Sequence, residues 1–398
     1  MKKKSSYTIP KGFRFGFTSC GIKKDGLEDL GVMVSDVPAV AAGTFTKNLV
    51  TAAPVILSKK NLKSKKHFGV ICNSGCANAA TGERGMGDAV ETLNLLASGI
   101  GCKPSELLVA STGVTVEFLP MDKIFKGIPG VIGNMIGDPA GFTRAILTTD
   151  TGPKSAGKSV TVGGKRVNIW GCTKGAGMYH PNMATMLGFL ATDAAVSKSA
   201  LNSALKEAVD ITYNRSTIDG DTSTNDSVFI LANGLAGNRP LAKGSADYKK
   251  FVSALIEVCG SLAEQIVSGG EGVKRIANVV VEKASSDAAA LKVAKSIAGS
   301  LLVKTALHGG DPNWGRILVA AGNAGVKFSL EKLDLYFGKT CAMKKGAPIP
   351  NAEKKLAVEM KNKKVEIKLV LNSGKGSSSY LFSDLSKEYV TINADYRT

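Results

Sequence analysis

The sequence lacks several features that would place it in a class at once. Within its 398 residues no run approaches the ~18 to 20 consecutive apolar residues of a membrane-spanning helix. No apolar segment followed by a small-residue cleavage site occurs after the first residues, so no secretory signal is expected. Seven cysteines, an odd number scattered along the chain, do not form a disulfide framework. We therefore expect a cytoplasmic protein with free thiols.

Arginine and aromatic residues are also scarce. The formal net charge is +18, yet only nine of the 51 basic residues are arginines, and aromatic residues make up 6% of the chain. Arginine binds phosphates and base edges through paired hydrogen bonds, and aromatic rings stack on bases. We therefore expect no nucleic-acid partner and no membrane partner. The lysine excess predicts a solvated coat whose field attracts an anionic small molecule.

Glycine, in contrast, is abundant. The 45 glycines exceed the ~7% of average proteins, which indicates many tight turns rather than a helical bundle. The apolar pattern predicts a layered α/β fold in two parts, with a strand-rich N-terminal half and a helix-rich C-terminal half that join near 180–200. Strands are expected over 31–46, 53–59, 67–75 and 106–112, and a helix over 88–101. Later helices are expected over 198–215, 246–270 and 286–307, and later strands over 227–234, 274–284, 316–322, 363–374, 379–384 and 389–398.

A formal nucleotide-binding motif occurs at Gly152–Ser159, where GPKSAGKS fits the pattern GxxxxGK[ST]. A functional loop of this kind leaves a strand and enters a helix, whose free N–H groups hold the phosphates. Here residues 159–171 alternate like two strands around Gly163 and Gly164, which predicts a β-hairpin. We interpret the motif as a chance match. Nucleotide hydrolysis stays a weak rival that would require a helix beginning near Lys158.

Metal-binding and common hydrolase motifs are missing as well. His67, His180 and His308 are far apart, and none belongs to an HExxH-type spacing. Cys72 and Cys76 have no second cysteine pair, so a tight turn explains them better than a metal site. No GxSxG elbow and no family-specific cysteine signature occurs. We expect no metal, no resident cofactor and no standard serine or cysteine hydrolase site.

The most informative segment is 173–194, TKGAGMYHPNMATMLGFLATDA, in which Thr185 stands where a glycine-rich loop changes to an apolar run. From physical considerations alone, a helix cap or a buried β-branched residue is the favoured interpretation, because no base stands beside the hydroxyl in sequence. A threonine becomes a nucleophile without a histidine when its own α-amino group serves as the base, with a pKa of ~7.7 to 8.0. That role requires cleavage between Ala184 and Thr185.

This segment closely resembles the nucleophile segment of the ornithine acetyltransferase family, the bifunctional glutamate N-acetyltransferase and amino-acid acetyltransferase of arginine biosynthesis. The resemblance spans essentially the whole chain, because further blocks occur in family order. They are GTFTKNLVTAAPV (43–55), NSGCANAATGERG (73–85), STGV (111–114), TTDTGPK (148–154), DGDTSTNDS (219–227), GGEGVKR (269–275), SLLVKTALHGGDPNWGRI (300–317) and YVTINADYRT (389–398). So many ordered blocks make the resemblance specific.

The resemblance implies self-cleavage just before Thr185. The products would be an α chain (1–184) and a β chain (185–398) that stay associated, usually as an α2β2 heterotetramer. Thr185 would accept the acetyl group of N2-acetylornithine and pass it to glutamate in a ping-pong covalent mechanism. Acetyl-CoA is a possible second donor.

The resemblance also assigns individual residues to roles in a site between the two halves. The family's oxyanion hole corresponds to Thr112 and Gly113. Its substrate contacts correspond to Thr148, Lys174, Thr185, Glu271, Asn393 and Thr398. A lysine suits a substrate carboxylate, and a glutamate suits the ornithine ammonium.

Four positions depart from the family pattern. Cys76 stands where asparagine is more common, Val116 where glycine is usual, and Ala176 and Tyr179 where serine and isoleucine are common.

Two alternative functions remain open. One is a threonine amidohydrolase or aminopeptidase on a related self-cleaving fold, in which water accepts the acyl group. The other is a non-catalytic binding protein that keeps its chain uncleaved.

Overall fold

The long strand β2 (Leu30–Phe45) organises the first part of the fold. The computed structural model describes residues 7–23, 26–180 and 186–395. The first half of β2 pairs antiparallel with β1 (Phe13–Thr18) and β3 (His67–Cys76), and its second half pairs antiparallel with β9 (Ser227–Ala232). The register with β3 shifts between Val34 and Ala39, and such an irregularity bends a strand. One strand thus connects two halves of a single eight-stranded sheet.

The strand order of this sheet is β4-β3-β2-β9-β7-β6-β5, with β1 also paired to β2. The remaining strands are β4 (Leu107–Val114), β5 (Lys154–Val162), β6 (Lys165–Lys174) and β7 (Leu187–Thr192). β5 and β6 form the predicted hairpin, with Gly163 and Gly164 at positive φ. Lys158 therefore lies within a strand, and the interpretation of the GxxxxGK[ST] motif as a chance match is confirmed.

Aromatic packing shows that the two halves of the sheet face each other. The Phe15 ring of β1 lies 4.9 Å from the Trp170 ring of β6, and the Phe142 ring lies 5.2 Å from the Phe189 ring of β7, measured between centroids. All four side chains belong to one buried cluster, fed by strands of both halves. Such a double layer must be covered by helices on its two outer faces, because each outer face is also apolar.

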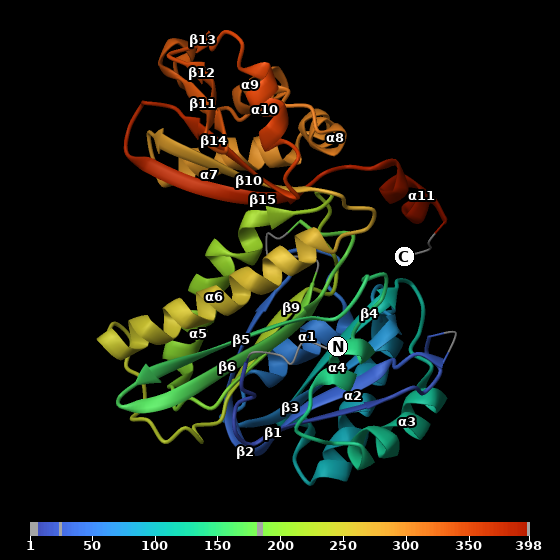
Figure 1. Ribbon diagram of the computed structural model, residues 1–398. Coiled ribbons are helices and arrows are strands. Elements are labelled where there is room, and N and C mark those ends of the chain that lie inside the picture. Colours follow the sequence, from blue (N-terminus) through green and yellow to red (C-terminus); the bar gives the residue numbers. More distant parts are fainter. Residues whose placement is uncertain (1–6, 24–25, 181–185, 396–398) are drawn as a thin grey trace, which may run out of the picture.

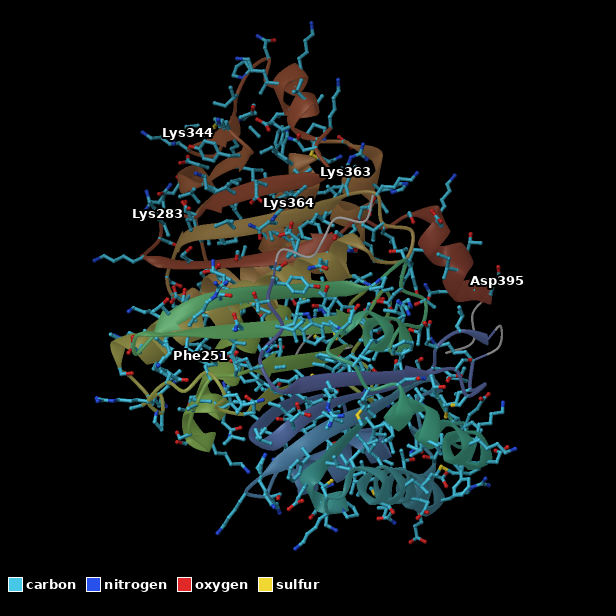
Figure 2. The ribbon with its side chains drawn as sticks, turned by 60° about the horizontal axis from the view of Figure 1, so that its bottom comes forward. Phe251, Lys283, Lys344, Lys363, Lys364 and Asp395 are labelled. Atoms are coloured by element: carbon cyan, nitrogen blue, oxygen red, sulfur yellow. The ribbon has the colours of Figure 1, made fainter. Side chains whose placement is uncertain are left out.

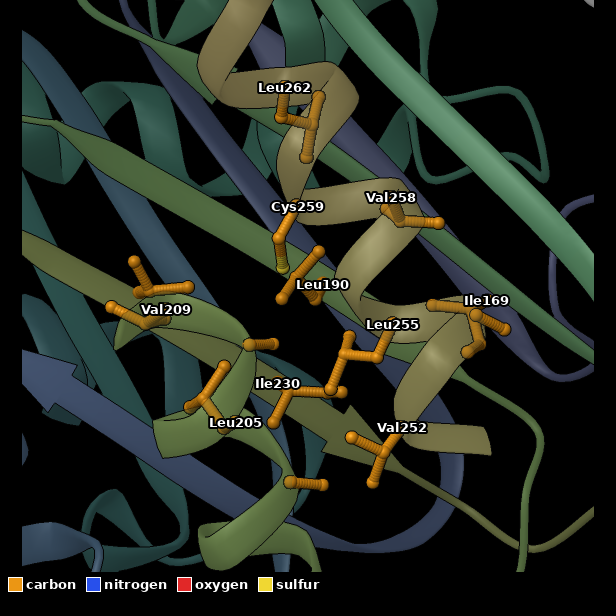
Figure 3. Packing of buried hydrophobic residues seen from close by; sticks show 14 of the residues in the cluster. Ile169, Leu190, Leu205, Val209, Ile230, Val252, Leu255, Val258, Cys259 and Leu262 are labelled. Atoms are coloured by element: carbon orange, nitrogen blue, oxygen red, sulfur yellow. The ribbon is translucent and has the colours of Figure 1, made fainter. Parts of the chain in front are cut away.

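Helices supply both covers. On one side lie α2 (Gly82–Ile100) and α3 (Met121–Gly133), with the shorter α1 (Ala53–Asn61) beside them. The short helix α4 (Ala140–Ala145) contributes Phe142 to the inner cluster instead. On the other side lie α5 (Lys198–Ile211) and α6 (Ala246–Ser268), whose apolar faces meet the strands. Figure 3 shows Leu205 of α5 and Leu255 of α6 converging on Ile230 of β9. The first part of the fold, called the first body from here on, is thus a helix–sheet–sheet–helix sandwich.

A second sheet forms a smaller body, shown in orange and red at the top of Figure 1. Its strand order is β13-β12-β11-β14-β10-β15-β8. The strands are β8 (Ser216–Thr217), β10 (Ile276–Ala284), β11 (Asp334–Phe337), β12 (Thr340–Lys344), β13 (Ala347–Pro348), β14 (Lys364–Val370) and β15 (Gly376–Ser383). The helices are α7 (Asp287–Gly299), α8 (Leu301–Gly309), α9 (Trp314–Gly322) and α10 (Glu353–Glu359). The last helix, α11 (Lys387–Asp395), stands at the side of the molecule (Figure 1).

The expected layered α/β fold is confirmed, and most expected elements occur, but three expected strands are helices. Residues 53–59 lie in α1, 316–322 in α9, and the described part of 389–398 in α11. Short apolar runs do not distinguish a strand from a buried helix. Pro54 stands in the first turn of α1, where proline is favoured, and the Asn313 side chain accepts from the Arg316 N–H to cap α9.

Helix α6 is long and apolar enough to cross a membrane by length and composition, with a mean hydropathy of 1.4 over its most apolar window. No such segment was expected from the sequence, because polar residues interrupt the apolar run of α6. Its packing explains this apolarity, because α6 covers the sheet beside α5 with Phe251, Leu255 and Leu262 fully buried. The helix is therefore a core element of the sandwich.

Several lysines of the second body lie on its surface. Figure 2 shows Lys283, Lys344, Lys363 and Lys364 around the second sheet, and all four residues are exposed. Lys344 and Lys364 form ion pairs there, whereas Lys304 of α8 is buried.

The position of Val116 generates a stability prediction. Its backbone is left-handed, with φ at +60°, and its side chain is 68% exposed. This conformation costs a side-chain-bearing residue ~1 to 2 kcal/mol, but glycine adopts it freely. The structure thus explains why glycine suits the position, and Val116→Gly is expected to raise the free energy of unfolding by about 1 kcal/mol.

Val319→Gly is the matched control, because Val319 is similarly exposed but lies within α9. Glycine should lower the free energy of unfolding there by about 0.5 kcal/mol, because its helix propensity is lower than that of valine by roughly this amount. Urea unfolding of both variants measures the two changes. A loss of stability in Val116→Gly as large as that in the control would contradict strain at Val116.

Candidate active site

A cavity of about 330 Å³ opens where the glycine-rich segments of the first body meet α11. Six residues predicted from the sequence line it: Thr112, Gly113, Thr148, Lys174, Glu271 and Asn393. The first and the last of them, Thr112 and Asn393, are 281 positions apart in the chain, so only folding brings the six together. Thr185, Ala184 and Thr398, which complete the prediction, lie outside the described residues.

Thr112 and Gly113 stand at the end of β4, opposite the end of β3. Gly113 has φ at +131°, and a Cβ there would lie 2.3 Å from the Gly75 carbonyl carbon. Only glycine fits this close approach of two strands. The Lys174 Nζ donates to the Thr112 Oγ1 over 3.2 Å, so the Thr112 hydroxyl proton is free to point elsewhere.

Lys174 itself ends β6 in a small cluster of buried charges. The Asp150 carboxylate accepts from the Lys154 ammonium at 2.5 Å and from the Gly175 N–H at 2.7 Å. Burial opposes ionisation of Asp150, but Lys174 and Lys154 outweigh it, so the pKa of Asp150 lies below its ordinary value. The carboxylate therefore stays charged and balances two lysines beside the cavity.

Glu271 supplies negative charge on the opposite side. It is only 6% exposed, and its Oε2 accepts from the Asn393 Nδ2 of α11 at 2.8 Å. A Cβ at Gly177 would lie 2.5 Å from the same oxygen, so the glycine leaves room for the carboxylate. With Lys174 and Glu271 in one cavity, the site fits a small ligand that carries both a carboxylate and an ammonium.

The seating of α11 depends on another glycine. Gly272 has φ at +65°, and a Cβ there would lie 2.7 Å from the Tyr389 backbone nitrogen. The Tyr389 hydroxyl donates to the Asp219 Oδ2 at 3.1 Å. These contacts hold Tyr389 and Asn393 at the cavity although no described residue of α11 is buried.

Sequence reasoning missed several lining residues, among them Met178, Asp221, Ser223, Asn225 and Tyr389. Asp221, Ser223 and Asn225 belong to the DGDTSTNDS block, and Tyr389 begins YVTINADYRT. The order of these blocks was the only sequence signal for these four residues. The first three lie in a loop whose course no local pattern specifies, and Tyr389 lies in α11, which the sequence predicted as a strand.

The Asp150–Lys154 pair generates a second prediction. The two side chains are 0% and 5% exposed, and breaking a buried pair leaves an uncompensated charge at a cost of ~3 to 5 kcal/mol. Asp150→Asn should lower the free energy of unfolding by that amount at pH 7, measured by urea denaturation. Because the pKa of Asp150 is lowered in the fold, the stabilisation is complete above the ordinary value of 3.8 and is lost as pH falls below it.

Glu257→Gln is the control, because the Lys158–Glu257 pair is about half exposed, at 46% and 54%. An exposed pair contributes at most ~1 kcal/mol. A loss below 1 kcal/mol in Asp150→Asn would show that the buried pair contributes no more than the exposed one.

Comparisons with known proteins identify the family of this chain. The ArgJ family matches residues 14–398. "Arginine biosynthesis bifunctional protein ArgJ" of Dehalococcoides mccartyi is 49% identical over 396 residues, covering 99% of this chain and 97% of that protein. The protein of the same name from Bacillus licheniformis is 42% identical over 398 residues, covering 100% and 98%.

Solved structures match as well. A crystal structure of arginine biosynthesis bifunctional protein ArgJ from Bacillus halodurans has 40% sequence identity and a TM-score of 0.50, and the match covers 51% of this chain and 96% of that chain. The family match over nearly the whole chain and the full-length similarity to the named relatives lead to one conclusion: this chain belongs to the ArgJ family.

Proposed function

We propose that this protein transfers the acetyl group of N2-acetylornithine to glutamate through an acetyl-Thr185 intermediate. The observation that carries the proposal is the convergence of Thr112 and Gly113 at the end of β4, Lys174 and Glu271 on one cavity. Family membership supports it, because the relatives are named as bifunctional proteins of arginine biosynthesis. Both substrates carry carboxylate and ammonium groups, which match the mixed charge of the cavity.

In the proposed reaction, the α-amino group of Thr185 accepts the proton of its hydroxyl, and Oγ attacks the acetyl carbonyl. Donors at Thr112 and Gly113 stabilise the oxyanion, and loss of one such donor typically costs ~2.7 to 4 kcal/mol. The ornithine α-amine leaves with a proton from the Thr185 ammonium. Glutamate's amine then attacks the acetyl ester by the reverse sequence and gives N-acetylglutamate.

The substrate groups find plausible partners among the lining residues. Lys174 suits the α-carboxylate, and its contact with Thr112 ties substrate binding to the proposed oxyanion hole. Glu271 suits the ornithine ammonium. The Asn393 Nδ2 donates to the Glu271 carboxylate and holds it in place. Thr148 and Thr398 are proposed as further contacts.

The mechanism requires self-cleavage between Ala184 and Thr185, which exposes the α-amino group. The solved Bacillus halodurans chain supports such a cut, because a match that covers 96% of it spans only 51% of this chain. That chain is about half as long, which is the result expected of a precursor divided near its middle. We further propose an α2β2 assembly in the cytoplasm and, since relatives are named bifunctional, acetyl-CoA as a second donor without any resident cofactor.

The intact mass of the denatured protein tests the nucleophile. The wild-type chain is expected to give two fragments that meet at Ala184 and Thr185, whereas Thr185→Ala should stay whole, because it lacks the attacking hydroxyl. Thr185→Ser is the matched control, which retains a hydroxyl and should still be cleaved. The cleaved enzyme should then form N-acetylglutamate from acetylornithine and glutamate.

Two outcomes would contradict the proposal. An uncut chain in the wild type would leave Thr185 without its base and favour a non-catalytic binding protein. Release of free acetate at a rate independent of glutamate would identify water as the acceptor, as in an amidohydrolase.

Removal of residues 393–398 tests the contribution of α11. The truncation should abolish acetyl transfer, because Glu271 loses its Asn393 partner, while the thermal unfolding midpoint stays nearly unchanged, since no described residue of α11 is buried. Val390→Ala is the control, because Val390 is 61% exposed on the same helix and does not line the cavity. Full transfer activity in the truncated protein would remove α11 from the site.

A further inference from the structure

The loop 219–226 holds both described flanks of the predicted cleavage junction. At its beginning, the Asp219 carboxylate accepts from the backbone N–H groups of Met178 at 2.5 Å and Tyr179 at 2.7 Å. At its end, the Asp226 Oδ1 accepts from the Met186 N–H at 2.6 Å. One loop of eight residues therefore bonds to the chain before and after the junction.

The contact at Asp226 fixes the residue that follows the proposed nucleophile. Met186 directly follows Thr185 in the chain, so this hydrogen bond fixes the described residue next to the proposed nucleophile. Met186 is itself 3% exposed, and its carbonyl accepts from the Ser227 N–H at 3.0 Å. The residue following the proposed nucleophile is thus fixed on both sides of its backbone.

Asp226 destabilises the fold at this position, because its carboxyl group is buried. It is 3% exposed, and its Oδ2 has no hydrogen-bond partner among the described residues. A buried polar atom left unpaired costs ~1 to 3 kcal/mol. Burial raises the pKa of Asp226 well above its ordinary value.

The same loop is attached to the strand that carries the proposed oxyanion hole. The Asn225 Nδ2 donates to the Ser111 carbonyl at 2.9 Å and to the Ala77 carbonyl at 2.6 Å. Ser111 directly precedes Thr112 in β4. The Thr46 Oγ1 donates to the Ser223 carbonyl at 2.7 Å and anchors the middle of the loop to the end of β2.

We propose that the loop 219–226 is the positioning element that fixes Met186, the residue after the proposed nucleophile, relative to the strand of Thr112 and Gly113, with Asp226 as its central positioning residue. Asn225 fixes the loop to the oxyanion strand, and Asp226 fixes Met186 to the loop. Two adjacent side chains therefore link the residue after the nucleophile to the strand of the proposed oxyanion hole. This inference rests on the proposed function, since it assumes that Thr185 is the nucleophile.

Replacement of Asp226 separates positioning from proton chemistry. Asp226→Ala removes the acceptor and should slow self-cleavage at least ~10-fold, since a misplacement of about 1 Å can cost on the order of 100-fold. Asp226→Asn should cleave within about 3-fold of wild type, because its amide oxygen can still accept from the Met186 N–H. The cleaved fraction of Asp226→Ala should show a lowered kcat with little change in KM.

Asp193 provides the matched control at the other end of β7. Its carboxylate is also buried and accepts from the Asn168 backbone N–H at 2.7 Å. Asp193→Ala should lower thermal stability but leave the cleavage rate of the folded protein unchanged. The fraction of intact chain is followed over time by mass spectrometry, beside thermal unfolding of each variant.

Several results would overturn the inference. Wild-type cleavage by Asp226→Ala, equal losses in Asp226→Asn and Asp226→Ala, or an equal loss in Asp193→Ala would each exclude a specific positioning role. If Asp226→Ala does not fold, Thr46→Val replaces it, since valine keeps the shape but removes the anchor to Ser223, and unchanged cleavage there would count against the loop. A wild-type chain that never cleaves would instead refute the proposed function.

Discussion

The antiparallel pairing of β6 with β7 is the interaction on which the rest of the structure depends. The ladder runs from Ile169 opposite Thr192 to Lys174 opposite Leu187, and the predicted cleavage junction lies in the connection between these strands. The strands stand within the sheet, with Trp170 and Phe189 in the core between its two layers. A cut in the connection would leave this ladder and core intact, so the two pieces would need no covalent bond to remain together.

The charges around the cavity follow from the same pairing. Lys174 ends β6 and is held beside the buried Asp150, whose burial is tolerated because two lysines surround it. Glu271 lies in the segment after α6. Gly177, which follows β6, leaves room for the Glu271 carboxylate, and Gly272 leaves room for α11. Fixed charges of opposite sign thus stand in place before any ligand arrives, which reduces the reorganisation that binding requires. The exposed lysines of the second body add only a diffuse field.

The sequence predicted much of this architecture, and its failures have physical causes. The strands at 31–46 and 67–75 and the hairpin after Gly152 were predictable from alternation and from Gly163–Gly164. The helices at 53–61 and 314–322 were not, because short apolar runs fit either structure until a cap or proline decides. Six lining residues were found through motif order. Asn225 and Tyr389 were missed because they act through contacts with residues more than 100 positions away.

The two-residue strand β8 carries a consequence for inheritance. Ser216 and Thr217 pair with Leu381 and Phe382 of β15, so the second sheet borrows a strand from the polypeptide of the first body just before Asp219. An edge strand of the second sheet therefore comes from the part of the chain that otherwise builds the first body. Gene recombination that exchanged the second body alone would separate β8 from its partner and shift the loop beside it. Selection is then expected to keep both bodies together as one evolutionary unit.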